Sequence, residues 1–423
     1  MERDENAAPD GRSPEGRSPE GRSTKGSPRG AANRVVEAHR QVRWTLPAIG
    51  LFAVAGVAAV AADERWVTLH LVLAGATILL ISAVSLMLTI TWSAAPAPSD
   101  LLVALQRTCV AVGVAVLVGG RRLDAPTWVP FAGALLYAVG LVGLAALLIV
   151  TISRGVERRF DLAVAGYVAA VAAGLVGAWL GASMVIGEVS PDVRDAHLLV
   201  NLLGLIGLVA FATLPFFLAT VVRSKMSPRA RPPVLAALLV WQVIALAVAV
   251  GGHLGGSEVA SAVGLGAYAL GIVVVAFHLP APTQRQFTWA GPRLVAMWLG
   301  TLWWAVVAAV AAVSTFTDGQ VMPERWISAL VVAGYGQIVW GSLAYLLPVI
   351  RGGGHKKLSA GFNRTRSWPG LVAANVTGLA LVAGLTYVAT AMFVLWCGDA
   401  AVRYVSLGLR RHAPPGAATG DPA

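Results

Sequence analysis

One apolar run, Ala196–Val222, is long enough to dictate the environment in which this chain folds. It reads AHLLVNLLGLIGLVAFATLPFFLATVV, and its few polar side chains are those of His197, Asn201, Thr213 and Thr220. A helix of this length extends about 40 Å, which exceeds the bilayer hydrocarbon thickness of about 30 Å. The run therefore predicts a membrane-crossing helix, in which every backbone N–H and C=O group can be bonded without water.

Ten further apolar runs accompany this one, and no loop between them is long enough to hold a soluble domain. Of all residues, 57% are hydrophobic and only 13% are charged, whereas a soluble domain carries about 25% charged residues. The sequence therefore predicts an all-α polytopic membrane helix bundle. Its eleven expected transmembrane helices cover residues 45–63, 66–92, 101–120, 127–152, 160–187, 196–222, 233–252, 257–278, 292–314, 326–350 and 370–396.

The lysines and arginines fall mostly in short loops, and their distribution predicts the orientation. With the N-terminus inside, the inner loops and the segment before the first helix hold seventeen of them, and the outer loops hold five. Because cytoplasmic loops carry such an excess, we expect a cytoplasmic N-terminus in a bacterial inner membrane. The net charge of +11 reflects these loops. No basic face typical of nucleic-acid binding accompanies it.

The polar ends of the chain define three regions. The N-terminal segment contains the repeat GRSPEGRSPEGRS, which cannot bury enough apolar surface to offset its ordering entropy. We expect a disordered cytoplasmic tail over residues 1–43, a transmembrane domain over 44–396 and a short extracytoplasmic tail over 397–423. Eleven spans place that last tail outside, although its three arginines, Arg403, Arg410 and Arg411, go against this location. A twelfth span is the alternative.

The spacing of three outside-to-inside helices indicates an internal repeat. The expected helices two, six and ten begin near His70, His197 and Trp326, so their starts are separated by 127 and 129 residues. This spacing predicts three pseudo-threefold units of four helices, of which the last is short. The alternative is that any bundle with helices of average length gives similar spacing.

Three of the seven histidines lie near the predicted outer ends of helices two, six and seven. They are His70 in WVTLHLVLAGA, His197 in DAHLLVNLLG and His253 in VGGHLGG. Neutral imidazole binds haem iron, copper and zinc, and neighbouring helices of a bundle can share one metal. We therefore predict that these three histidines hold haem or copper and that Asn201, on the same helical face as His197, orients that ring. The alternative is that each ring meets water or headgroups.

Few other polar residues interrupt the spans. Asn201, Gln242, Gln337 and Asn375 are intramembrane amides, for which hydrogen bonding to a neighbouring helix is the favoured role. Arg107 is close enough to the inner end of its helix to reach the surface. A charge at the centre of a span would indicate an ion or proton path. None is found, which argues against ion-coupled transport and against proton pumping.

Several segments carry a family resemblance. They are WVTLHLVLAGA at 66–76, LQRTCVAVGVA at 105–115, RRFDLAVAGYVAAVAAGLVGAWLGASM at 158–184, AHLLVNLLGLIGL at 196–208 and GYGQIVWGSLAYLLPVIRGGG at 334–354. Through them the chain resembles the membrane region of bacterial multicopper-oxidase-associated proteins. It is distantly similar to haem-copper-oxidase-like membrane proteins and to haem- and copper-containing nitric-oxide-response membrane proteins.

The resemblance implies metal-ligating histidines in helices two, six, seven and ten near the outer side, which His70, His197 and His253 match in the first three. The sequence also departs from the pattern. The motif HxHxN of helix six has Leu199 in place of its second histidine, and helix ten offers Tyr335 and Gln337 but no histidine. A bis-histidine haem across helices two and ten therefore cannot form as in the oxidases. No cupredoxin domain follows the last span.

Three hypotheses of function remain open at this point. The leading one is a haem- or copper-associated redox protein that works with an extracytoplasmic electron-transfer or copper protein. The second is a transporter or channel-like permease, which would require broken helices at mid-depth. The third is a membrane anchor or assembly partner without chemistry. In all three the lipid bilayer is the main partner, and the sequence leaves open whether the chain is an enzyme.

Overall fold

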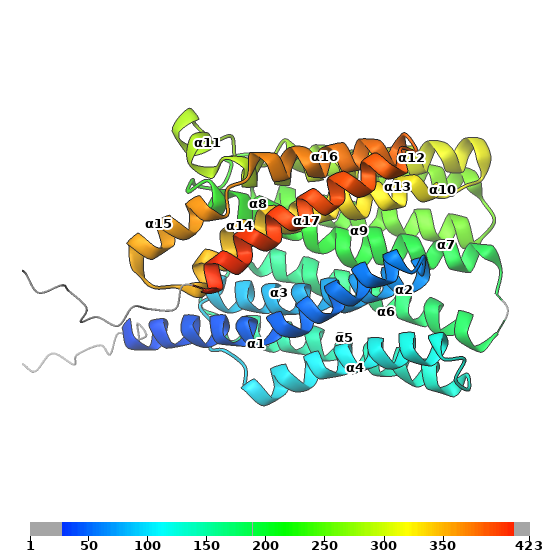
Figure 1. The fold of residues 1–423 in the computed structure, drawn as a ribbon, viewed down its shortest axis with the longest axis horizontal. Helices are drawn as coiled ribbons and strands as arrows, with labels where there is room; N and C mark the ends of the chain where they lie inside the picture. The colour runs from blue at the N-terminus through cyan, green and yellow to red at the C-terminus, as the bar shows by residue number, and fades with distance from the viewer. Residues whose placement is uncertain (1–27, 188, 410–423) are drawn as a thin grey trace, which may run out of the picture.

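The computed structural model describes residues 28–187 and 189–409, and within these ranges the chain folds into helices without a β-strand. The long helices lie side by side along the longest axis of the molecule (Figure 1). Eleven of the described helices are long and apolar enough to cross a membrane. The predicted all-α polytopic bundle is therefore confirmed.

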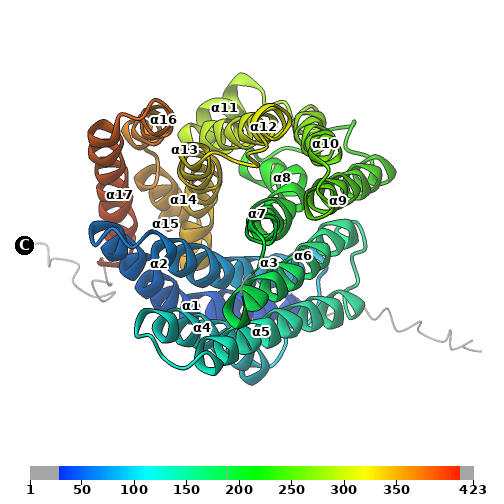
Figure 2. The ribbon, with the colours of Figure 1, turned by 90° about the vertical axis from the view of Figure 1, so that its right-hand side faces the viewer.

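The helical span Pro191–Val221 is the structural centre of the bundle. In its most apolar window 83% of the residues are buried, compared with 17% in the first span and 11% in the last. The view along the bundle places its first part near the middle of the molecule (Figure 2). The other helices therefore surround the run from which the sequence analysis started.

Three of the spans change their hydrogen-bonding register partway along. Each begins as an α-helix, continues as a π-helix and returns to an α-helix. The π-helical segments are η1 (His70–Thr77), η2 (Val200–Ile206) and η3 (Leu330–Gly336). Their first residues are 130 residues apart in both intervals. Since π-helices are rare and short, this regular recurrence supports the predicted threefold repeat more strongly than helix spacing alone.

Each unit contains four successive helical segments, and the second carries the π-helical segment. The first unit consists of α1 (Pro28–Ala61), α2 (Arg65–Leu69) with η1 and α3 (Ile78–Trp92), α4 (Asp100–Arg122) and α5 (Trp128–Ser153). The second consists of α6 (Asp161–Ile186), α7 (Pro191–Leu199) with η2 and α8 (Gly207–Val221), α9 (Pro232–Leu254) and α10 (Glu258–Ala276). The third consists of α12 (Pro292–Asp318), α13 (Glu324–Ala329) with η3 and α14 (Gln337–Arg351), α16 (Trp368–Val382) and α17 (Thr386–Leu409).

The same helix pairs pack together in each unit. The last two helices of a unit lie against each other, as α4 does on α5, α9 on α10 and α16 on α17. The last helix of one unit also packs on the first helix of the next, as α5 does on α6 and α10 on α12. Two short helices, α11 (Gln284–Ala290) and α15 (Gly354–Arg364), lie at the end of the bundle where α1 begins (Figure 1).

The prediction of a single helix over residues 370–396 is wrong. Helix α16 ends at Val382 and α17 begins at Thr386. Between them Gly384 adopts a positive φ of 75°, a conformation that glycine reaches without steric cost. The apolar run therefore contains a tight reversal, and the third unit is completed by a twelfth helical segment. Helix α16 has 15 residues, which is short for a span.

The reversal brings the end of α17 back to the end of the bundle where α1 begins (Figure 1). Arg403 marks this position, because its Nη1 donates to the backbone oxygens of Arg364 at 3.2 Å and of Arg366 at 2.6 Å. Residues 397–409 thus belong to a helix rather than to a tail. Arg403 then lies at the basic end of the bundle, and its conflict with the charge asymmetry disappears.

The first helix begins earlier than predicted. Helix α1 starts at Pro28, so residues 28–43 are helical, while residues 1–27 lie outside the described part. This extension covers Arg107, which does not reach the surface as expected but is buried between α4 and α1. Its Nη1 donates to the oxygen of Gln41 and to Oγ1 of Thr45, both at 2.5 Å. Gln41 in turn donates to Asp100 at 3.0 Å.

Side chains bond to backbone oxygens inside the π-helical segments. A carbonyl is passed over where a π-helical ladder returns to α-helical spacing, and a buried carbonyl needs another donor. Tyr268 Oη donates to the oxygen of Leu203 at 2.6 Å and Tyr335 Oη to that of Leu202 at 2.8 Å. Gly207 leaves room for both tyrosines, since a Cβ there would lie 2.4 Å from the Tyr268 hydroxyl.

We expect Tyr335→Phe to destabilise the folded protein by roughly 0.6–1.7 kcal/mol, because it removes one buried hydrogen bond between helices. Thermal unfolding of the purified protein in detergent measures the change. Tyr387→Phe is the matched control, since 93% of the Tyr387 side chain is exposed. Equal unfolding temperatures for the two variants would contradict a structural role for the Tyr335 hydroxyl.

The twelfth segment predicts that Arg229 and Ser406 lie on one side of the membrane and Thr127 on the other. Single cysteines at these positions, in a background lacking Cys109 and Cys397, can be tested with a membrane-impermeant maleimide in intact cells and in inverted vesicles. The variants Arg229→Cys and Ser406→Cys should react in the same preparation, and Thr127→Cys in the opposite one. Reaction of Ser406→Cys together with Thr127→Cys would restore the eleven-span topology.

Candidate functional site

The structure brings two of the three predicted histidines together. His70 is the first residue of η1, and His197 lies three residues before η2. Their imidazole rings are 6.3 Å apart between centroids and are inclined by only 17°. The two π-helical segments of neighbouring units thus begin beside one pair of nearly parallel imidazoles, which we call the imidazole pair.

Both rings of the imidazole pair are anchored through Nδ1. The Nδ1 atom of His70 lies 2.8 Å from the backbone oxygen of Trp66, and that of His197 lies 2.8 Å from the backbone oxygen of Gly177. A carbonyl oxygen only accepts, so each Nδ1 carries the proton and donates it. Each Nε2 therefore keeps its lone pair for a ligand.

The two anchoring bonds differ in how much they specify. The bond of His70 goes one turn back along its own helix, and His278 makes the same kind of bond to Val274 at 2.8 Å. The bond of His197 instead crosses from α7 to α6. Packing between these helices therefore fixes the position of the His197 ring.

Glycines on α6 make room for the His197 ring and its neighbour. A Cβ at Gly181 would lie 2.9 Å from Cε1 of His197, and a Cβ at Gly177 would lie 2.5 Å from Nδ2 of Asn201. These contacts are shorter than a side chain can tolerate without a shift of its neighbours. The two glycines, which are one helical turn apart, form a cradle for His197 and Asn201.

Asn201 acts on His197 mainly through the backbone. Its Nδ2 donates to the oxygen of His197 at 2.7 Å and lies 3.3 Å from Nδ1 of the same residue. Since that Nδ1 already donates to Gly177, the longer contact is not a good hydrogen bond. Asn201 therefore holds the helical turn that carries His197, whereas the sequence predicts that it orients the ring.

Aromatic and cationic groups cover one side of the pair. The ring of Trp66 lies 4.1 Å from that of His70 between centroids, with a 30° tilt. The guanidinium carbon of Arg121 lies 4.8 Å from the Trp66 ring centroid. Trp66 and Arg121 thus place an aromatic surface and a cation beside the first histidine.

His253 has a different environment from the other two histidines. It ends α9 and is 8% exposed. Its Nε2 lies 3.7 Å from Oδ1 of Asp192 and 3.8 Å from Oδ2 of Asp195. Over residues 28–187 and 189–409, no three His, Cys, Asp or Glu side chains come together in a way that could hold a metal ion. A ligand role for His253 stays a prediction.

Amides lie beside the third π-helical segment, where the resemblance would place a histidine, with Gln337 at the start of α14 and Asn375 in α16. Gln337 Nε2 donates to the oxygen of Ala333 at 2.6 Å, and Gln337 and Asn375 exchange hydrogen bonds at 3.2 and 2.9 Å. Trp303 Nε1 also donates to Asn375 at 3.1 Å. These amides join α12, α14 and α16, as the sequence predicts. Gln242 differs, because it is buried and neither polar atom of its side chain has a partner among the residues that the structure describes.

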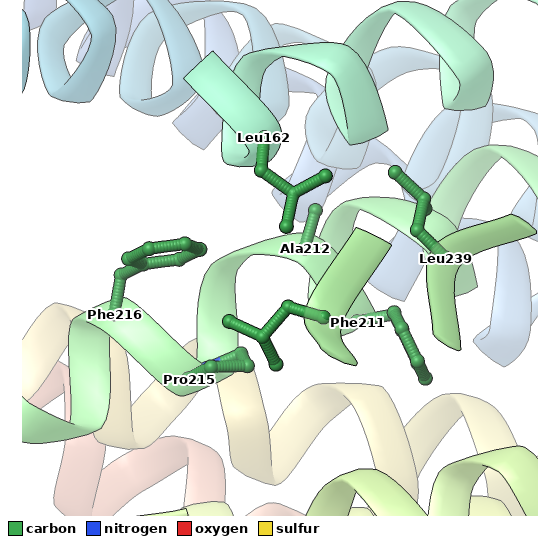
Figure 3. Close-up of a pocket in the computed structure, with 7 residues that line it drawn as sticks. Leu162, Phe211, Ala212, Pro215, Phe216 and Leu239 are labelled. Atoms are coloured by element: carbon green, nitrogen blue, oxygen red, sulfur yellow. The ribbon is translucent and has the colours of Figure 1, made fainter. Parts of the chain in front are cut away.

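A small apolar pocket lies in the second unit around Pro215. Leu162, Phe211, Ala212, Phe216 and Leu239 surround it (Figure 3), and Leu235 completes the lining. Its volume is about 10 Å³, which is close to the minimum for one water. Because no polar side chain lines it, this pocket offers no chemistry.

Sequence reasoning found the imidazole pair but missed the groups that fix it. The backbone carbonyls of Trp66 and Gly177 hold the two rings, and Gly177 and Gly181 leave room because they lack a side chain. A single sequence does not reveal which carbonyls or glycines have these roles. The spacing of small residues in α6, GLVGAWLGAS, is the one available hint, because such residues permit close helix approach.

These observations define the class: an all-α, multi-pass membrane protein built from three four-helix units around a central span. No known protein family, curated protein or solved structure matches the chain. The function of this chain is therefore inferred from its own geometry.

The cradle predicts that Gly177→Ala destabilises the protein by about 1–3 kcal/mol, since its Cβ overlaps the Asn201 amide. Thermal unfolding in detergent measures the effect. Gly119→Ala is the matched control, because nothing lies within 4 Å of a Cβ at that helical position. The control should be neutral or stabilising by about 0.4–1 kcal/mol. A loss of stability as large in Gly119→Ala would contradict the cradle.

Proposed function

We propose that this protein is a redox-associated membrane protein that holds a haem or a copper ion at the imidazole pair. The observation that carries the proposal is the engagement of both Nδ1 atoms by backbone carbonyls, with 2.8 Å in each case. Histidines that bind metals almost always donate the other ring N–H in this way, which fixes the tautomer and the ring orientation.

The separation of the rings fits two ligands of one metal. Imidazoles that bind a metal through Nε2 with bonds of about 2.0–2.1 Å have ring centroids roughly 5–6 Å apart, depending on the angle at the metal. The observed separation of 6.3 Å lies just above this range, so a small approach of the two rings would suffice for both to bind one metal. His70 and His197 would hold the metal through their Nε2 atoms.

The surroundings of the pair suit a metal that changes its charge. Haem iron or copper would supply one-electron transfer, and the protein would supply orientation and electrostatics. The Gly177 carbonyl holds the His197 ring, Asn201 holds its helical turn, and Trp66 packs beside His70. Each of these residues would limit ring movement and keep the ligand geometry constant between oxidation states.

The remaining expectations form part of the same proposal. The imidazole pair lies at the end of the bundle opposite the basic loops, so a cytoplasmic N-terminus would place it at the outer surface of a bacterial inner membrane. A soluble extracytoplasmic electron-transfer or copper protein could then exchange electrons with it. The family resemblance carried by the segments around His70 and His197 supports this assignment.

The experiment compares His197→Ala with His278→Ala. The full chain is purified in detergent from cells supplied with haem precursor and copper, and its iron and copper contents and oxidised and reduced absorption spectra are recorded. The unsubstituted protein and His278→Ala, whose ring makes the same bond as that of His70 but at the other end, should retain about one metal per chain. His197→Ala should lose it.

Either of two results would contradict the proposal. One is an unsubstituted protein without stoichiometric iron or copper under these conditions. The other is equal metal content in His197→Ala and His278→Ala, which would place the metal elsewhere. Asn201→Ala provides a graded test, since loss of a supporting group lowers metal affinity by about 10–100-fold.

A further inference from the structure

A polar cavity lies at the other end of the bundle, where α1 begins. Its volume is about 250 Å³, and it opens between the turn after α8, the helices α11 and α12, and the surface helix α15. Arginine, histidine, serine and asparagine side chains line it together with Trp289, Leu358 and Phe362. Three of these lining residues, Arg223, Arg293 and Arg366, carry a permanent positive charge.

Arg293 forms the floor of this basic cavity and is almost fully buried, with 2% of its surface exposed. Its Nε donates to the oxygen of Ala290 at 2.8 Å and its Nη2 to that of Trp289 at 3.0 Å. The guanidinium also lies over the rings of Trp289 and Phe362, at 4.6 and 4.8 Å from their centroids. Its Nη1 has no partner in the described structure.

Arg223 reaches the same aromatic ring from the turn after α8. Its guanidinium carbon lies 4.0 Å from the Trp289 ring centroid, so Trp289 contacts two cations. Arg223 also adopts a positive φ of 55°, which is uncommon for a residue with a side chain. The strained backbone at residue 223 thus carries a cationic side chain that lines the cavity.

Arg366 supplies the third cation from the segment between α15 and α16. Its Nη2 donates to the oxygen of Thr288 at 2.8 Å. In the described ranges, none of the three arginines has a carboxylate within 4 Å. Grouped cations repel one another, and a buried guanidinium without a counter-charge is costly. An anion is therefore the missing part of this site.

We propose that the basic cavity binds a phosphate group, carried either by an anionic lipid headgroup or by a free phosphate ion. A tetrahedral dianion or diester can accept from several guanidinium groups at once, and arginine forks fit its oxygens. Basic pockets between helices at the cytoplasmic side recognise lipid headgroups by this chemistry. The cavity volume of about 250 Å³ is large enough for a phosphate group.

The test uses the full chain, delipidated in a neutral detergent. Phosphatidylglycerol, cardiolipin, phosphatidylcholine and inorganic phosphate are titrated separately, and binding is followed by native mass spectrometry and thermal shift. The variants are Arg223→Asn and Arg366→Gln, alone and combined. Asn tolerates the left-handed backbone of residue 223. The controls are Arg229→Gln and Arg285→Gln, which are exposed arginines at the same end of the bundle but outside the cavity.

Each variant in the cavity should weaken phosphate-group binding by at least about tenfold, as loss of a charge-assisted hydrogen bond implies. The controls should change it by less than about twofold. Tight phosphatidylglycerol or cardiolipin binding that the cavity variants weaken identifies a lipid as the source. Inorganic phosphate binding with the same variant dependence, and without lipid binding, identifies the free ion.

Three results would overturn the proposal. They are no binding of phosphatidylglycerol, cardiolipin or inorganic phosphate, measurable binding of phosphatidylcholine that equals that of phosphatidylglycerol, or equal effects of cavity and control variants. If the double variant does not fold, Arg223→Asn alone decides the question, because residue 223 is exposed and its replacement does not open the core. A tenfold loss in that variant keeps the proposal, and an unchanged affinity rejects it.

Discussion

The rest of the structure depends on how the backbone carbonyls of the π-helical segments are satisfied. In a membrane interior no water is present to bond a carbonyl that the helix passes over. The residue at the end of each segment differs: Thr77 is the last residue of η1, Gly207 directly follows η2 and Gln337 directly follows η3. Thr77 donates to the oxygen of Val72 at 2.9 Å and Gln337 to that of Ala333 at 2.6 Å. Gly207 has no side chain, and Tyr268 and Tyr335 fill its place from neighbouring helices.

This solution explains why the second unit is the centre of the bundle. Because the donors to η2 come from α10 and from η3, the central span cannot be satisfied by its own unit alone. Tyr335 ties the third unit to the second, and Trp304 of the third unit, which is fully buried, packs on the rings of both Tyr335 and Tyr268. On the other side, the imidazole pair joins the second unit to the first. All three units thus meet at helices that change register.

Hydropathy and charge were sufficient for most of this architecture but not for its end. The repeat was visible as 127- and 129-residue spacing, and the π-helical segments refine it to 130 residues. The turn at Gly384 is not predicted because it lies inside an apolar run, and the hydropathy of the sequence does not change there. The predicted start of helix α1 is too late for the opposite reason. Arg40 and Gln41 are polar and resemble tail residues, but both bond to Asp100 at the start of α4 in the same unit.

The candidate site, like the fold, could be predicted only in part from the sequence. His70 and His197 could be chosen from the sequence because both lie near the predicted outer ends of spans that the repeat relates. Whether His253 lies beside them depends on the rotation of α9 about its axis, which the apolar composition of this helix does not specify. In the structure His253 lies near Asp192 and Asp195 instead. The fixed tautomer of His197 could not be anticipated, since it arises from the carbonyl of Gly177 on a neighbouring helix.

The most direct test of the account is an experimental density map of the full chain in lipid nanodiscs, at a resolution that shows carbonyl oxygens. The account predicts π-helical bonding at 70–77, 200–206 and 330–336, with the two imidazole rings about as close as the 6.3 Å found here. Regular α-helices through these segments, or a His70 ring turned away from His197, would contradict both the threefold construction and the site built on it.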